Sequence, residues 1–180
     1  GDGAMMNSAA GTLTLTNANT YTGNTTVSGG TFEIGGAGQL GSGAYSANIP
    51  ISSGATLKYN STADQVLSGV ISNAGSIVKD TTGMLTPSGA NSGAGSTTVS
   101  GGILRLSNAT ALSTGPLAIN GGVVELANGN LSRPLGTSGS QVRVPGGTSG
   151  FSAYGAPRTV TLGTAGSSLT WGSTNFAPTT

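Results

Sequence analysis

Short alternations of apolar and polar residues recur along the chain. They are clearest at residues 12–16, 32–34 and 142–144, where leucine, isoleucine, valine or phenylalanine alternates with threonine or a charged residue. Alternation with a period of two is typical of a β-strand that buries one face, and no stretch shows the 3.6-residue period of a helix. Clusters of glycine, serine, threonine and asparagine separate the strands, as turns require. The pattern predicts an all-β protein.

One phrase marks several strands: two glycines, any residue, and then an apolar, a charged and an apolar residue. It occurs at residues 29–34, 101–106 and 121–126, and a looser relative with one extra residue occurs at 53–59. The two apolar side chains lie two positions apart, so they point to one side of a strand while the charge points to the other. We expect the former in the core and the latter at the surface.

The strands recur at a regular spacing. Leu104 and Val124 are separated by about 20 residues, and Val124, Val142 and Val160 follow one another at equal, slightly shorter intervals. Repeats of this length, made of short strands and turns, are typical of a solenoid in which equivalent residues of neighbouring coils stack. The spacing predicts a parallel β-helix with about 18–25 residues per coil and about eight or nine coils, with these four residues in equivalent positions.

A longer repeat relates two distant segments. The sequence GTLTLTNANTYTGNTTVSGGTFEI, from Gly11, returns in diverged form as GMLTPSGANSGAGSTTVSGGILRL, from Gly83, and we call this relation the long repeat. Where the first copy has Leu15, the second has Pro87, which has no amide hydrogen to give to a neighbouring strand. We therefore expect a bend or a strand end at Pro87.

The middle of the chain is harder to place, and the alternation does not choose a strand register for residues 66–90. Strands expected at residues 75–79 and 83–86 begin close together in the sequence, well within the length of one coil. We expect them on different sides of one coil.

The first copy resembles the autotransporter passenger-associated β-strand repeat of bacterial surface proteins, because it has Asn-Thr-Tyr-Thr-Gly followed by Thr-Thr-Val in that order. The second copy, residues 83–106, is similar but more diverged. Residues 66–71 with 75–79 resemble the segment that commonly precedes the unit. Together these similarities cover most of residues 11–126.

This resemblance implies a right-handed parallel β-helix at the bacterial cell surface or in the extracellular space, acting as a stalk, fibre segment or adhesive passenger. It implies no catalytic activity, because a scaffold repeat occurs in proteins with different roles. Members of the family usually have a signal peptide upstream and often a membrane barrel or anchor downstream. We expect residues 1–180 to be a single β-helix segment of a longer repeat protein.

The composition limits the classes of partner. The 180 residues include 33 glycines but only 6% charged residues, with a formal net charge of +1 and neither histidine nor cysteine. The few basic residues are scattered, so they form no patch for nucleic acid or an anionic membrane, and no apolar run reaches the roughly 20 residues of a membrane-spanning helix. We expect no nucleic-acid binding and no membrane insertion of this segment. Glycine-rich tracts also occur in flexible linkers, but a linker has no reason to keep alternating strands.

A β-helical enzyme that acts on polysaccharides is the main alternative. Such an enzyme needs clustered carboxylates, for acid and base work or for holding Ca²⁺. The acidic residues are spread along the chain: Asp2, Glu33, Asp64, Asp80 and Glu125. Because histidine and cysteine are absent, catalytic triads based on histidine and ordinary zinc sites are excluded. We predict no catalytic residue, no metal ligand and no cofactor.

Charged residues of neighbouring phrases suggest ion pairs instead of an active site. Glu33 and Lys58 occupy equivalent positions, as do Arg105 and Glu125. We expect each pair to lie side by side on adjacent coils and to contribute under about 1 kcal/mol.

Ranks of threonine raise a further alternative, an ice-binding or glycan-binding solenoid. A flat ice-binding face needs the same Thr-x-Thr pair on nearly every coil, whereas the recurring phrases carry charged residues at Glu33, Arg105, Glu125 and Arg143. This replacement argues against a uniform face.

The aromatic residues fall into two groups. Tyr59 and Trp171 are expected in the core. Tyr21 and Tyr45 lie in predicted turns and are the candidates for contact with a surface glycan or a host-cell partner. Both ends of a solenoid expose unpaired backbone groups, and neither terminus resembles a charged cap, so we also expect further chain or end-to-end self-association.

Overall fold

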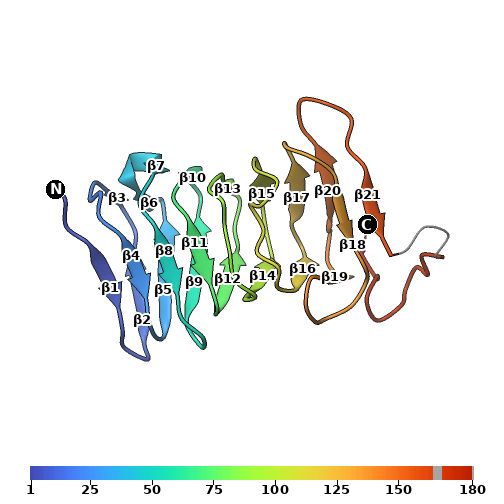
Figure 1. The fold of residues 1–180 in the computed structure, drawn as a ribbon, viewed down its shortest axis with the longest axis horizontal. Helices are drawn as coiled ribbons and strands as arrows, with labels where there is room; N and C mark the ends of the chain where they lie inside the picture. The colour runs from blue at the N-terminus through green and yellow to red at the C-terminus, as the bar shows by residue number, and fades with distance from the viewer. Residues whose placement is uncertain (164–167, 180) are drawn as a thin grey trace.

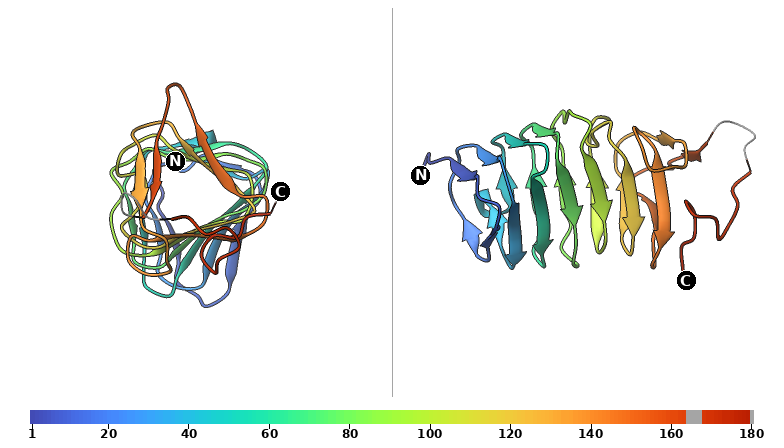
Figure 2. Two further views of the ribbon diagram at one scale, coloured as in Figure 1. Left: turned by 90° about the vertical axis from the view of Figure 1, so that its right-hand side faces the viewer. Right: turned by 90° about the horizontal axis from the view of Figure 1, so that it is seen from below.

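The chain winds into a parallel β-helix in the computed structural model, which describes residues 1–163 and 168–179. Its coils follow one another along a single axis from the N-terminus to the C-terminal region (Figure 1). Viewed along that axis, the coils surround a common lumen (Figure 2). The predicted all-β solenoid architecture is confirmed.

Three sheets form most of the wall. The seven-stranded sheet contains, in spatial order, β2 (Thr12–Leu15), β5 (Thr31–Gly36), β9 (Thr56–Ser61), β12 (Ser76–Lys79), β14 (Ser96–Val99), β16 (Leu117–Asn120) and β19 (Val142–Gly146). The six-stranded sheet contains β7 (Ala44–Tyr45), β10 (Gln65–Leu67), β13 (Leu85–Pro87), β15 (Ile103–Leu106), β17 (Val123–Leu126) and β20 (Gly150–Ala153). The four-stranded sheet contains β1 (Met5–Asn7), β4 (Thr25–Val27), β8 (Ile49–Ile51) and β11 (Ile71–Asn73).

Two small sheets complete the wall near its ends. They pair β3 (Ala18–Asn19) with β6 (Gln39–Leu40), and β18 (Leu131–Arg133) with β21 (Val160–Leu162). A single turn of 3-10 helix, η1 (Gly41–Gly43), precedes β7. Because the longest sheet has seven strands, the described residues form seven coils there, fewer than predicted.

The shortfall arises because several coils are longer than the expected repeat. Thr56 pairs with Ser76, whereas Leu131 pairs with Val160, so the later coil is nearly half as long again as the earlier one. Longer turns near the C-terminal end take up the additional residues (Figure 1).

Alternation along the strands sorts side chains between lumen and surface as predicted. In β5, Phe32 and Ile34 are fully buried while Glu33 between them is partly exposed. The aromatic side chain of Tyr59 is also buried in the lumen, as expected. Burying an aliphatic or aromatic side chain of this size contributes about 1.5–3 kcal/mol, so the columns of inward-facing residues hold the coils together.

The prediction of a single column through Val124, Val142 and Val160 is wrong. Val124 pairs with Phe151 in the six-stranded sheet, and Val142 pairs with Leu117 in the seven-stranded sheet. Val160 lies in β21, which belongs to neither of these sheets and pairs with β18. A full coil in this region runs from Leu117 to Val142, so the shorter steps between the three valines carry the chain only about two thirds of the way around.

The two copies of the long repeat lie on different walls. Leu13 of the first copy belongs to the seven-stranded sheet, and Leu85 of the second copy belongs to the six-stranded sheet. Three coils take the chain from Leu13 through Phe32 and Leu57 to Ile77, and one further strand takes it to Leu85. The long repeat therefore spans about three and one third coils.

The expectations for the middle of the chain are confirmed. Strand β12 lies in the seven-stranded sheet and β13 in the six-stranded sheet, on different sides of the coil. Pro87 is the last residue of β13.

The prediction that Trp171 lies in the core is wrong. Residues 169–171 form no strand, and the chain after them runs beside β19, where the Val144 amide donates to the Asn175 carbonyl at 2.8 Å. The Trp171 indole packs edge-on against Phe176, with ring centroids 5.2 Å apart, and 65% of its surface stays exposed. It therefore lies outside the core, against Phe176.

Candidate functional site

The two tyrosines predicted to meet a partner lie together near the N-terminal end. Their rings pack edge to face with centroids 5.7 Å apart, and the hydroxyls of Tyr21 and Tyr45 each lie 2.8 Å from the Thr25 hydroxyl. The Tyr45 hydroxyl also donates to the Gly23 carbonyl. Tyr45 is only 1% exposed, so it is not available to a partner, and Tyr21 is partly buried.

Burial sets the ionisation of this pair. It raises the pKa of Tyr21 to about 12 and also raises the pKa of Tyr45, because a phenolate would lose hydration there. Both hydroxyls therefore stay protonated at neutral pH and serve as hydrogen-bonding groups. The sequence placed both residues in turns, but Tyr45 is the last residue of strand β7. No sequence signal indicated the ring-to-ring contact with Tyr21.

The predicted ion pairs on neighbouring coils are present. Lys58 Nζ lies 3.9 Å from Glu33 Oε2 and 3.7 Å from Asp80 Oδ2, on the outer face of the seven-stranded sheet. On the six-stranded sheet, Arg105 Nε donates to Glu125 Oε1. All five side chains are partly exposed, so each pair contributes under about 1 kcal/mol.

A column of hydroxyl side chains runs along the outer face of the seven-stranded sheet. Its members on five successive coils are Thr12, Thr31, Thr56, Ser76 and Ser96. The neighbouring column includes Glu33, Lys58 and Val78, so the face is not a uniform Thr-x-Thr array. Arg105 and Glu125 belong to a different sheet, which the sequence spacing did not reveal.

No cluster of acidic residues was found within residues 1–163 and 168–179. No group of three or more aspartates or glutamates there is close enough to hold a metal ion. In the same part of the chain, no helix has the length and apolar character needed to cross a membrane.

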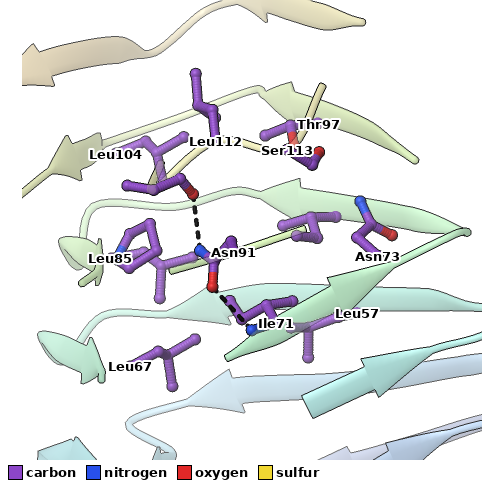
Figure 3. A pocket seen from close by; sticks show the side chains of 13 residues that line it. Leu57, Leu67, Ile71, Asn73, Leu85, Asn91, Thr97, Leu104, Leu112 and Ser113 are labelled. Carbon is purple, nitrogen blue, oxygen red and sulfur yellow. Dashed lines mark hydrogen bonds between the residues drawn. The ribbon is translucent and has the colours of Figure 1, made fainter. Parts of the chain in front are cut away.

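The lumen is closely packed around one small void. The void has a volume of about 20 Å³, and Figure 3 shows three of the leucines that line it, Leu67, Leu85 and Leu104, on successive coils. Asn91 joins three coils there: its Oδ1 accepts from the Ile71 amide and its Nδ2 donates to the Ala111 carbonyl, both at 2.8 Å (Figure 3). The lumen is a packed core with room for about one water molecule, not a channel.

Lys79 is fully buried at the end of β12. Its Nζ donates to the carbonyls of Asp80, Thr81 and Gly101 at 2.6, 2.7 and 3.0 Å and lies 5.7 Å from the centre of the Tyr59 ring. Burial lowers the pKa of Lys79 to about 8. The ammonium group therefore joins the turns of two coils.

Arg133 is the second buried cation, 8% exposed at the end of β18. Its Nη1 donates to the Gly115 carbonyl and its Nη2 donates to the Ser113 carbonyl, both at 2.7 Å. Burial lowers the pKa of its guanidinium, yet arginine remains protonated at any physiological pH. No carboxylate within the described ranges forms an ion pair with it.

Two clefts open on the outer surface. The first has a volume of about 190 Å³ and is lined by Arg133 together with Asn108, Asn128, Asn130 and Ser132, above leucine side chains. The second, of about 260 Å³, lies over Ala118 between Thr98 and the exposed Arg143. Neither cleft is lined by an acidic residue, so neither offers a general acid or base.

Tyr154 is the tyrosine that faces solvent. It follows β20, is 51% exposed, and packs against the Arg105 guanidinium, with 4.1 Å between Arg105 Cζ and the ring centre. Nothing in the sequence around Tyr154 favoured it over Tyr21 or Tyr45 as a candidate for contact with a partner. Its exposure depends on which sheet β20 joins, and the sequence did not reveal that.

Comparisons with known proteins found one family model that matches parts of the chain. Residues 10–34 and 77–106 match the family model described as the passenger-associated-transport-repeat. The matches fall on the two copies of the long repeat, which confirms the resemblance predicted from the sequence. No curated protein and no solved structure matches this chain.

Proposed function

Because the chain carries two passenger-associated-transport repeats in one β-helix, we propose that it is part of an autotransporter passenger, exposed on a bacterial surface or released from it. Within that passenger it serves as a non-enzymatic rod that projects or supports adhesive surfaces. The observation that carries the proposal is the pair of family matches, which occur in two segments with the same strand pairing.

The architecture supports a load-bearing role. Hydrogen bonds between coils run along the axis, and inward-facing residues pack coil on coil without a break between Val27 and Val144. Each coil contacts only its neighbours, so the length of such a rod grows with the number of repeats. A stiff spacer needs no active site, and the clefts described above carry no acidic residue.

Adhesion and self-association belong to the same proposal. The outer faces are rich in hydroxyl and amide groups, which suit sugar ligands, and Tyr154 offers an exposed ring. At the N-terminal end, Leu13 and Leu15 of β2 are only partly buried, so a further coil or a second copy stacked there would complete their burial. Sedimentation velocity over a range of concentrations tests stacking, and a constant monomer mass would contradict it.

The location can be tested in the producing bacterium. An antibody against this segment should label intact cells or detect the segment in the medium, and external protease should remove the cell-bound signal. A cytoplasmic protein of the same cells serves as the control for lysis. Signal that appears only after lysis would contradict the proposal.

The non-enzymatic role has a separate test. The purified chain, incubated with pectate, alginate and chondroitin sulfate, should release neither reducing ends nor unsaturated products. Turnover of any of these polymers would favour the enzyme alternative.

A further inference from the structure

The third wall of the β-helix is interrupted between the four-stranded sheet and the β18–β21 pair. Beyond β11, an isolated bridge between Ser72 and Ser92 extends the wall by one coil, and residues 107–114 of the next coil form no strand. The Arg133 side chain crosses this gap to the Ser113 and Gly115 carbonyls. A guanidinium thus takes the place of part of a backbone ladder.

The positively charged guanidinium of Arg133 is buried, but it lines a cleft that opens to solvent. Arg133 is more than nine-tenths buried, and the described residues give it two carbonyl acceptors but no carboxylate. A guanidinium has five N–H donors, and two of them are used in these bonds. Buried charges in proteins are normally paired, because the desolvation of an isolated charge is costly.

The cleft outside Arg133 has the chemistry of a sugar site. Asn128 lines it with a carboxamide that forms no side-chain hydrogen bond within the described residues, and Asn130 adds an Nδ2 donor while its Oδ1 accepts from the Thr159 amide. Carboxamides donate and accept hydrogen bonds, as sugar hydroxyls require. The Asn108 side chain, which also lines the cleft, is bonded to the Ser88 carbonyl and to Thr110. Leu106 and Leu126, which belong to the buried core, close the inner side of the cleft. Its volume of about 190 Å³ is enough for one small residue of a chain whose ends extend into solvent.

We propose that this cleft binds an acidic sugar residue, with its carboxylate paired to the Arg133 guanidinium and its hydroxyls bonded to Asn128 and to the Asn130 Nδ2. The carboxylate would supply the counter-charge that the protein does not provide. The proposal rests on the proposed surface location in one respect: acidic polysaccharides must be present where the chain is exposed. The chemistry of the cleft stands apart from it.

Titration calorimetry of the purified chain with digalacturonate tests the site. We expect saturable binding that weakens as sodium chloride is raised, because salt screens the ion pair. The neutral analogue galactobiose should bind at least about tenfold more weakly, the equivalent of losing about 1.4 kcal/mol. Inorganic sulfate should also bind more weakly than digalacturonate, because it makes none of the hydroxyl contacts.

Two substitutions provide the variant and its matched control. Ser132→Asp places a carboxylate on the exposed rim of the cleft and should weaken digalacturonate binding about tenfold or more. Asn120→Asp makes the same change in charge at an exposed position on the seven-stranded sheet and should leave binding unchanged. Circular dichroism should show the same strand content for both variants.

The assignment would be overturned by no binding of digalacturonate, by equal binding of galactobiose, or by equal loss in both variants. Sulfate bound as tightly as digalacturonate would also contradict it, because the site would then recognise negative charge and not the sugar. None of these results bears on whether the chain is a surface-exposed rod, which the antibody experiment decides.

Discussion

The two copies of the long repeat, each extended by six residues at its start to 5–34 and 77–106, have the same strand pairing but lie on different walls of the β-helix. Asn7 pairs with Val27 in the four-stranded sheet, and their counterparts in the long repeat, Lys79 and Val99, pair in the seven-stranded sheet. The repeat therefore encodes how a coil meets the next coil, and the lengths of the intervening turns decide which wall it occupies.

Side-chain contacts are preserved between the copies even where the residue changes. Asn7 Nδ2 donates to the Gly29 carbonyl at 2.9 Å, and Lys79 Nζ donates to the Gly101 carbonyl at 3.0 Å. The requirement at this position is a buried donor to the next coil, and amide and ammonium groups both satisfy it.

An ion pair is also preserved, with its signs reversed. Glu33 of the first copy meets Lys58 on the following coil, and its counterpart Arg105 meets Glu125. The difference that matters more is context, because the first copy lies at the end of the rod and the second has coils on both sides.

The largest expected difference between the copies is in the stability lost when an equivalent leucine is removed, because the two leucines are buried to different extents. Leu85→Ala should cost about 2–5 kcal/mol, because Leu85 is 2% exposed in the lumen. Leu13→Ala, at the equivalent position of the first copy, should cost about 1 kcal/mol, because Leu13 is only partly buried. Urea unfolding followed by circular dichroism measures both. Equal losses would show that the end coil is as well packed as the middle.

Substitution of an equivalent glycine should strain both copies in the same way. Gly30 and Gly102 have φ values of 59° and 60°, and in each an added Cβ would lie 2.2 Å from a backbone oxygen of the preceding coil. Gly102→Ala should cost about 3 kcal/mol through strain and coil separation. Gly30→Ala should introduce the same local strain but a smaller global loss. Thermal melts of the two variants, with Gly54→Ala as a positive-φ control in open space, measure the contribution of the close approach.

The rise of stability with pH should come from Lys79, in the second copy, alone. The folded pKa of Lys79 is lowered to about 8, so between pH 8 and about 10 the unfolded chain binds more protons and stability should rise with pH. The gain should reach about 2 kcal/mol before tyrosine ionisation opposes it, because burial raises the folded pKa of Tyr21, Tyr45 and Tyr59.

Lys79→Asn installs the residue of the first copy and should abolish the rise. Urea midpoints at intervals from pH 7 to 10 measure it in both proteins. A rise that persists in the variant would show that another group is responsible.

The smallest effects concern the reversed ion pairs. Double-mutant cycles with Glu33→Gln and Lys58→Met, and with Arg105→Met and Glu125→Gln, should give coupling energies under about 1 kcal/mol. The Arg105–Glu125 coupling should be the larger, because its contact is closer and its side chains are less exposed. Both should shrink in high salt. A Glu33–Lys58 coupling larger than that of Arg105–Glu125 would contradict this ranking.

Local patterns predicted the strands and their inward faces well. Phe32 and Ile34, or Val142 and Val144, are buried because alternation fixes the two sides of a strand wherever it lies. The pairing of Glu33 with Lys58 also followed from equivalent positions in neighbouring phrases.

Long-range placement could not be predicted in the same way. The equal steps from Val124 to Val160 matched the expected coil length, but they cross between walls because the turns there are longer. Tyr45 was assigned to contact a partner, and its burial against Tyr21 depends on the coil behind it. The cleft beside Arg133 had no sequence signal, because it opens between two neighbouring coils where the wall lacks a strand.

The amino-acid sequence by itself determined that this chain is a parallel β-solenoid, built from a repeat whose alternating residues and turn glycines specify how one coil stacks on the next. Which wall each strand joins, which cations are enclosed and where the wall opens were decided only in the tertiary structure. The physical reason is that a coil's sequence fixes the direction of its side chains, whereas the summed length of its turns fixes the angle at which they meet the neighbouring coil.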